Sequence, residues 1–414
     1  MKPKQTWLAL LGVVLGVLSA AGLGIYSFLN ATAPLHPDPK DVPSVTHAAP
    51  SQEWADAVEQ ARQLARADLV EQNLPGLSVA VGAGGEIVWA EGFGWADLEN
   101  RVPVAPGTRF RIGHASKAIT SAAVGLLLEK GRLRLGDQIQ TYVPAFPRKQ
   151  WPVTLRQLMG HVAGVRHYRN EVDYMPSAHC DRAADGLRSF ENDPLLFEPD
   201  TQSRYSTFAW ILVSAAVEAA AGEPFFTFMR TQICEPLGMA DTTSDSATES
   251  IPDQATFYYP RLSGDPSFGP ELATTVDYSC FAGAGAFLAT PSDLVRFGMA
   301  VSSRPRQGFG AQGGKLLQPG TVEKLQTPQL LASGEETEYG LGWMVETVPL
   351  AGTPTRLAGH ASRTLLGGST SFLTFPERGL VVAVTSNISK AGTRSIALKI
   401  AEVFAAQGKI LARK

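Results

Sequence analysis

His114 and Lys117 are the residues whose types and spacing most directly suggest chemistry. A helix is predicted from about Ala115 to Lys130, because its apolar residues recur with a helical period and Gly131 follows. Positions three residues apart in a first helical turn share a face, so the imidazole and the amine would lie together at the positive end of this helix. An imidazole in that place can act as a nucleophile or activate a water molecule.

A serine is missing where the same geometry would need one. An enzyme that acylates serine needs a nucleophile, a base, a proton shuttle and backbone donors, and one compact arrangement places the serine three residues before a lysine. None of the twelve lysines has a serine at that spacing, and His114 stands there before Lys117. Ser116 is no simple substitute, because two helical positions turn a side chain by about 200°.

Phrases in chain order carry a resemblance to a known family. Arg111–Thr120, Arg204–Thr207 and Gly359–Ser362 (followed by Gly367–Ser369) resemble the S-x-x-K, Y-x-N and K-T-G or H-x-G motifs of the class C beta-lactamase and penicillin-binding protein superfamily. Further phrases of this kind are Gln157–Gly164, Asn192–Phe197, Glu235–Met239, Tyr339–Trp343 and Ala397–Ala401. The likeness covers about residues 55–405 and looks most like the serine beta-lactamase-like proteins of bacteria and mitochondria.

The resemblance implies roles for individual residues. Lys117 would be the general base, Tyr205 the proton shuttle, and His360 the hydrogen-bond donor of the third motif. The backbone N–H groups of His114 and Arg363 would form the oxyanion hole. The chain departs from the family pattern at His114, and also where Thr207 replaces the usual Asn and Ala361-Ser362 replaces Thr-Gly.

Three interpretations of His114 stay open from the sequence. In the first, the nucleophile is lost and the pocket binds a ligand without being acylated. In the second, the imidazole acts as nucleophile or base beside Lys117 and Tyr205. In the third, the site uses another serine, such as Ser116 after a register shift. His161 and His167 are interpreted as structural.

The surrounding elements predict an α+β fold. A helix over 51–72 and a hairpin over 77–96 come first, helices dominate 140–260, and strands over 339–346, 370–375 and 380–387 precede a final helix over 393–407. This order suggests one antiparallel sheet built from both chain ends and flanked by helices, with an inserted helical subdomain. The resemblance identifies it as beta-lactamase/transpeptidase-like. The domain is predicted over 51–414, with the helical subdomain at roughly 140–300.

The N-terminus predicts export. Residues 1–6 carry Lys2 and Lys4 and would form a cytoplasmic tip, and residues 7–29 are apolar and long enough to cross a membrane. A cleaved signal peptide is the alternative, because Ala31-Thr32-Ala33 suits signal peptidase. Either way the domain would lie outside the cytoplasm, anchored or secreted. Residues 30–50, rich in proline, read as a linker.

Composition excludes several functions. The net charge of −3 argues against a nucleic-acid-binding protein. No spacing of cysteines or histidines resembles a metal motif, and no cofactor is expected. Export permits a disulfide, and we predict Cys180–Cys280, with Cys234 as a buried free thiol; three reduced cysteines are the alternative.

Two function classes remain. One is a hydrolase of amide or ester bonds in small peptide-like or ester substrates. The other is a non-catalytic peptide- or cell-wall-binding module that uses the same cleft. A homo-oligomer is an open possibility, because some relatives of this kind form filaments.

Overall fold

The computed structural model describes residues 3–31, 33–175, 178–247, 250–302, 316–362 and 367–411. The helices are α1 (Pro3–Ala31), α2 (Ala55–Glu71), α3 (Ser116–Glu129), α4 (Leu155–Met159), α5 (Glu171–Tyr174), α6 (Thr207–Ala221), α7 (Phe225–Met229), α8 (Pro291–Ala300), α9 (Pro319–Gln326) and α10 (Thr393–Leu411). The strands are β1 (Ser44–Thr46), β2 (Gly76–Ala83), β3 (Glu86–Asp97), β4 (Val102–Pro103), β5 (Phe110–Arg111), β6 (Thr243–Ser244), β7 (Tyr258–Pro260), β8 (Pro270–Leu272), β9 (Phe287–Ala289), β10 (Met344–Leu350), β11 (Thr353–Ser362), β12 (Ser369–Phe375) and β13 (Leu380–Ser386).

An antiparallel sheet forms the centre of the domain. Its order is β1-β3-β2-β13-β12-β11-β10, with β4 paired to β3. Strands from the two ends of the domain meet where β2 pairs with β13, from Leu77 opposite Ser386 to Ala83 opposite Leu380. This confirms the predicted α+β fold with a sheet built from both chain ends.

The predicted strands differ from the observed ones near the end of the chain. The strand expected from Tyr339 begins only at Met344, because Gly342 has a φ of 99° and interrupts the extended run. The hairpin predicted over 77–96 is present as β2 and β3, and Gly84 and Gly85 at its turn have the positive φ that this turn requires.

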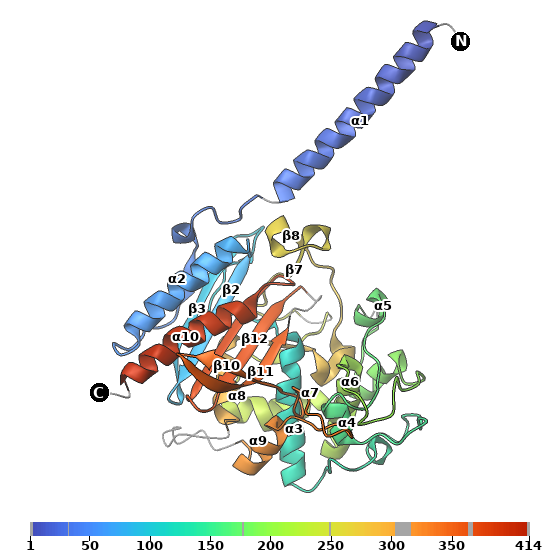
Figure 1. The fold of residues 1–414 in the computed structure, drawn as a ribbon, viewed down its shortest axis with the longest axis vertical. Coiled ribbons are helices and arrows are strands. Elements are labelled where there is room, and N and C mark those ends of the chain that lie inside the picture. Colours follow the sequence, from blue (N-terminus) through green and yellow to red (C-terminus); the bar gives the residue numbers. More distant parts are fainter. Residues whose placement is uncertain are drawn as a thin grey trace.

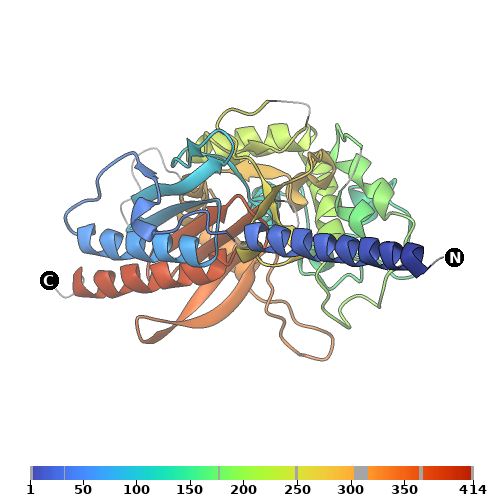
Figure 2. The ribbon, with the colours of Figure 1, turned by 90° about the horizontal axis from the view of Figure 1, so that it is seen from above.

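Each face of the sheet is covered by helices. Figures 1 and 2 show α2 and α10 side by side on one face, where they bury apolar residues such as Leu69 and Phe404. Helix α8 covers the other face, because its Val295 and Gly298 lie against β2 and β13. We expected the helical subdomain to extend to about residue 300, but α8 packs on the sheet and so belongs to the sheet domain.

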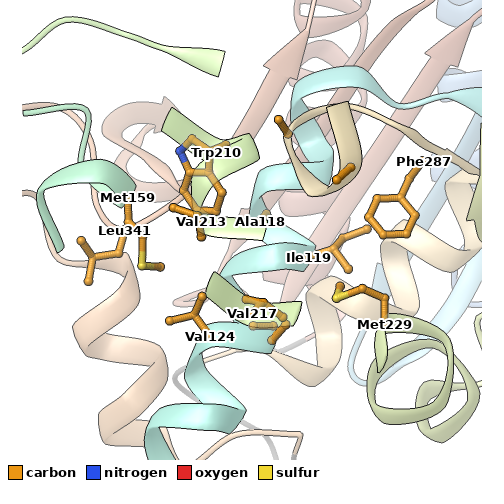
Figure 3. Close-up of a cluster of buried hydrophobic side chains, with 14 of the residues drawn as sticks. Ala118, Ile119, Val124, Met159, Trp210, Val213, Val217, Met229, Phe287 and Leu341 are labelled. Atoms are coloured by element: carbon orange, nitrogen blue, oxygen red, sulfur yellow. The ribbon is translucent and has the colours of Figure 1, made fainter. Parts of the chain in front are cut away.

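The helical region packs around α6. Trp210, Val213 and Val217 of α6 meet Ala118, Ile119 and Val124 of α3 in one buried cluster (Figure 3). Helix α6 is apolar on all sides and almost wholly buried, as expected of a core helix. The position of α3 is therefore fixed by the helical region as well as by the sheet.

The segment 30–50 differs from the expected free linker. Val42 and His36 are buried, β1 pairs with the edge of β3, and the side chain of Asn73 accepts a hydrogen bond from the N–H of Leu35 at 2.7 Å. The described part of this segment is thus packed on the domain, because it supplies hydrogen bonds and apolar cover to an otherwise open sheet edge.

A disulfide joins Cys180 and Cys280, whose Cα atoms lie 4.9 Å apart, while Cys234 is a buried free thiol. Cys280 lies in the short helix Ser279–Ala284. The last residue of that helix, Ala284, accepts a hydrogen bond from the Lys117 amine at 2.8 Å. The bridge therefore holds a segment that in turn holds Lys117.

Removing this bridge should destabilise the fold. A loop of 100 residues is closed, so Cys180→Ala/Cys280→Ala should lower the free energy of unfolding by about 4.7 kcal/mol in the chain-entropy model. Urea denaturation measures the loss. Reductant should lower the stability of the wild type and of Cys234→Ala by a similar amount and leave the double variant unchanged. An unchanged wild type in reductant would contradict the prediction.

Candidate active site

His114 and Lys117 lie where the chain enters α3. The short 3-10 helix Gly113–Ala115 runs directly into α3, and Gly113 has a φ of 49° at this entry. Lys117 is fully buried, whereas His114 is half-buried. Both face Tyr205: the His114 ring lies 5.2 Å from the Tyr205 ring, and the Lys117 amine lies 5.1 Å from it.

Tyr205 and His360 complete the cluster. Tyr205 precedes α6, whose first turn is capped by the Ser206 hydroxyl. His360 is buried on β11, 6.2 Å from the His114 ring and 6.4 Å from the Tyr205 ring, measured between ring centroids. The structure therefore brings together all four side chains that the sequence singled out, from three elements far apart in the chain.

Tyr339 is a neighbour that sequence reasoning missed. Its hydroxyl lies 2.8 Å from Nε2 of His360, and its ring lies 5.8 Å from that imidazole. Tyr339 begins the family-like segment Tyr339–Trp343, but nothing in the sequence indicated that its hydroxyl forms a hydrogen bond with His360.

His161 and His167 position the backbone around Tyr205. Nδ1 of His161 accepts a hydrogen bond from the N–H of Ser206 at 3.1 Å, and Nδ1 of His167 accepts one from Thr207 at 3.3 Å. The ring of His161 also lies 4.3 Å from that of Tyr205. His161 does this with a φ of 61°, a conformation that non-glycine residues adopt rarely and mostly where the surroundings impose it.

Burial disfavours positive charge in the site. Desolvation lowers the pKa of Lys117 well below its usual value, and no acidic side chain among the described residues pairs with its amine. Desolvation, followed by the nearby Lys117, also lowers the pKa of His114 well below its usual value. The pKa of His360 falls to about 3 for the same two reasons. A lowered pKa makes each group lose its proton more readily, and an unprotonated amine or imidazole is a base.

Tyr205 is neutral as well. Burial and the neighbouring Tyr339 raise the pKa of its hydroxyl well above the usual value. The Thr207 hydroxyl lies near enough to lower this pKa slightly, although the Tyr205 hydroxyl forms no complete hydrogen bond with a described residue. A protonated phenol in this position can donate a proton, and its hydroxyl is available to form a hydrogen bond with a ligand.

The backbone N–H of His114 is already occupied. It donates to Oγ of Ser362 at 3.3 Å, and Ser362 is itself buried at the end of β11. This N–H is one of the two expected oxyanion donors. The other, Arg363, lies outside the described residues.

The end of β11 has an open side. Pairing with β10 stops at Met344 opposite Gly359, while pairing with β12 continues to Ser362 opposite Thr370. Within the described part of the chain, residues 360–362 thus have a strand on one side only. Strand β10 is the edge of the sheet on this side, so only these last three residues of β11 are open.

Ser116 does not take over as nucleophile in this arrangement. It is fully buried at the first position of α3, and its hydroxyl makes no hydrogen bond with any residue that the structure describes. Lys117 therefore does not activate it.

Comparisons with known proteins agree with the fold and the family resemblance. The beta-lactamase family model matches residues 55–406. The human mitochondrial serine beta-lactamase-like protein LACTB is 30% identical over 447 residues, covering 85% of this chain and 80% of its own. The putative penicillin-binding protein PbpX of Bacillus subtilis is 29% identical over 63% of this chain and 60% of its own.

Solved structures share the fold at low identity. FmtA from Staphylococcus aureus has a TM-score of 0.69 at 18% identity, covering 88% of this chain and 91% of its own. The octameric penicillin-binding protein homologue from Pyrococcus abyssi has a TM-score of 0.66 at 23% identity, covering 86% and 78%. The match of the family model over most of the chain and the identity to LACTB lead to one conclusion: the chain belongs to the beta-lactamase family.

Proposed function

We propose that this protein is an exported, membrane-anchored member of its family that binds a peptide-like amide or ester ligand in the cleft around Lys117, Tyr205 and His360. In this proposal no acyl-serine forms at position 114.

The hydrogen bond between His114 and Ser362 carries the proposal. An acylating site needs a serine at position 114 and a free N–H on the same residue to stabilise the oxyanion. Here the side chain is an imidazole, and the N–H is used by Oγ of Ser362 at 3.3 Å. Both the nucleophile and a donor are therefore unavailable for the usual acyl transfer.

The other features of this cluster favour ligand binding. A buried lysine without an ion-pair partner costs stability, so its presence supports a functional role for this cluster. The open side of residues 360–362 offers backbone groups to a ligand in an extended conformation, as in strand addition. Peptide-like ligands suit this geometry because they carry the matching backbone groups.

Hydrolysis without an acyl-serine is the second candidate. Its support is the lowered pKa of His114, which leaves the imidazole unprotonated near Lys117. A neutral imidazole can attack an activated ester or take a proton from water.

Membrane attachment is proposed from α1. Its stretch Leu10–Leu29 is apolar, exposed along its length and long enough to cross a bilayer. We place residues 1–6 on the cytoplasmic side, residues 7–29 in the membrane and the family domain on the far side. A cleaved signal would release the same domain.

Turnover assays separate the two candidates. The purified chain should bind a fluorescent penicillin reversibly, while nitrocefin and p-nitrophenyl acetate should not be hydrolysed above background. His47→Ala is the matched control, because His47 is an exposed histidine remote from the cluster. Ester hydrolysis that His114→Ala or Lys117→Ala abolishes and His47→Ala preserves would establish the hydrolase instead. If the protein neither binds the penicillin nor hydrolyses either substrate, both candidate functions are wrong.

A further inference from the structure

We infer that the hairpin of β7 and β8, residues 258–272, touches the lipid of the leaflet from which α1 emerges. The inference rests on the proposed membrane anchor and adds a second attachment point that the anchor alone does not require.

The outer end of α1 lies against this hairpin. Figure 1 shows β8 directly beside the end of α1 that joins the domain. The ring of Phe28, in the last turn of the apolar stretch, lies 6.0 Å from the ring of Phe268 between β7 and β8. The twenty residues of that stretch span roughly 30 Å, which matches the hydrocarbon thickness of a bilayer.

The depth of Phe28 sets the depth of the hairpin. If the apolar stretch fills the hydrocarbon layer, Phe28 lies at its outer boundary, with Tyr26 among the aromatic residues that favour this level. The headgroup region adds about 5–7 Å on each side of the hydrocarbon layer. A side chain 6.0 Å from Phe28 is therefore at or within the interfacial region.

The hairpin presents leucines to its surroundings. Leu262 is 72% exposed and Leu272 is 71% exposed, among the most exposed large apolar side chains of the domain. Leu262 has φ 58° and ψ 22°, which bulky L-residues seldom adopt. The backbone conformation of Leu262 costs free energy, and so does exposing its apolar side chain to water. Contact with lipid would remove the second cost.

Charge argues for apolar insertion over attraction to anionic headgroups. Between residues 258 and 272 the only basic residue is Arg261, against Asp265 and Glu271. A hairpin with more acidic than basic residues is not attracted to an anionic leaflet. Contact should therefore form equally well with zwitterionic lipid.

Two attachment points would restrict how the domain stands on the membrane. A single helix lets a domain tilt and rotate, whereas the helix and the hairpin together fix its orientation. The candidate site would then be held at one height and one angle above the bilayer.

Depth-dependent quenching tests the contact. The full-length protein carrying Cys234→Ala and Leu262→Cys is labelled with an environment-sensitive fluorophore and placed in phosphatidylcholine nanodiscs containing lipids with a nitroxide near the headgroup. We expect strong quenching of this label. Leu330→Cys is the matched control, because Leu330 is also exposed (56%) but follows α9, at the far end of the domain from α1 (Figure 1). It should stay unquenched.

A reference label in the anchor distinguishes the possible failures. Leu18→Cys should be quenched by nitroxides deeper in the acyl chains if α1 spans the bilayer. A quenched Leu18→Cys with an unquenched Leu262→Cys would overturn the hairpin contact alone; no quenching at either position would overturn the anchor as well. If the label at residue 262 is quenched only when phosphatidylserine is present, the contact depends on anionic headgroups, and the claim that apolar insertion drives it is wrong. If the label at residue 262 reports an apolar environment but is not quenched by the lipid nitroxides, a second copy of the protein covers it, and the lipid contact is wrong. Leu272→Cys provides a second reading if Leu262→Cys misfolds.

Discussion

His114→Ser together with Ser362→Gly should convert this protein into one that is acylated by penicillin, while His114→Ser alone should react about 100-fold to 1,000-fold more slowly. The wild type should form no covalent adduct. The single variant regains a hydroxyl three residues before Lys117, but the N–H of residue 114 would still donate to the Ser362 hydroxyl, as it does at 3.3 Å in the wild type.

The expected ratio follows from the role of that N–H. Losing one oxyanion-hole donor typically costs about 100-fold to 1,000-fold in rate. Glycine at 362 has no side chain that could occupy the donor, so the substrate oxygen could take its place. Because the two changes act on one interaction, their effects should not be additive.

Mass spectrometry and the labelling rate with a fluorescent penicillin measure the outcome. Ser362→Gly alone should remain unlabelled, since it has no nucleophile. Adding Lys117→Met to the double variant should abolish labelling, since the base is lost. Equal rates for His114→Ser and the double variant would show that Ser362 does not obstruct the donor. No labelling of any variant would contradict the assignment of these residues to the family motifs.

Acid should destabilise this domain, because His161 and His360 are buried and His114 and His167 are partly buried, each with a lowered pKa. Burial lowers the pKa of His360 to about 3 and that of His167 to about 4, and it lowers those of His114 and His161 well below the usual value. In the unfolded chain each titrates near pH 6.5.

The sign follows from where the protons bind. Below about pH 6.5 the unfolded chain takes up protons that the folded chain excludes, so acid favours unfolding. The stability present above pH 6.5 is lost progressively toward pH 3 to 4. Each histidine whose pKa is lowered in the folded state adds at most about 1.4 kcal/mol per pH unit to this slope.

Urea denaturation at pH 7, 6 and 5 checks this expectation. His360→Gln removes one titrating group and retains an amide for the Tyr339 hydroxyl, so its slope should fall by about 1.4 kcal/mol per pH unit. His47→Gln, at an exposed position, should leave the slope unchanged. A wild-type stability that stays flat from pH 7 to 5 would show that these histidines are protonated in the folded state.

The sequence determined the parts that depend on local pattern. The period of apolar residues located α2, α3 and α10 within a few residues, and the strand pattern over 77–96 located the first hairpin. The order of the motifs identified the family, and the residues before Lys117 showed that His114, and not a serine, stands three positions before that lysine. These features are readable because they depend on neighbours within one or two helical turns.

Only the tertiary structure decided what the departures from the motifs do. Ser362 and His114 are 248 residues apart, and no local pattern indicates that the hydroxyl of one accepts the N–H of the other. The same holds for Tyr339 on His360 and for the packing of residues 33–50 on the sheet edge. Such contacts form when two distant segments are brought together by the sheet and the helical core, because a hydrogen bond depends on distance and angle in space and leaves no periodic trace in the chain.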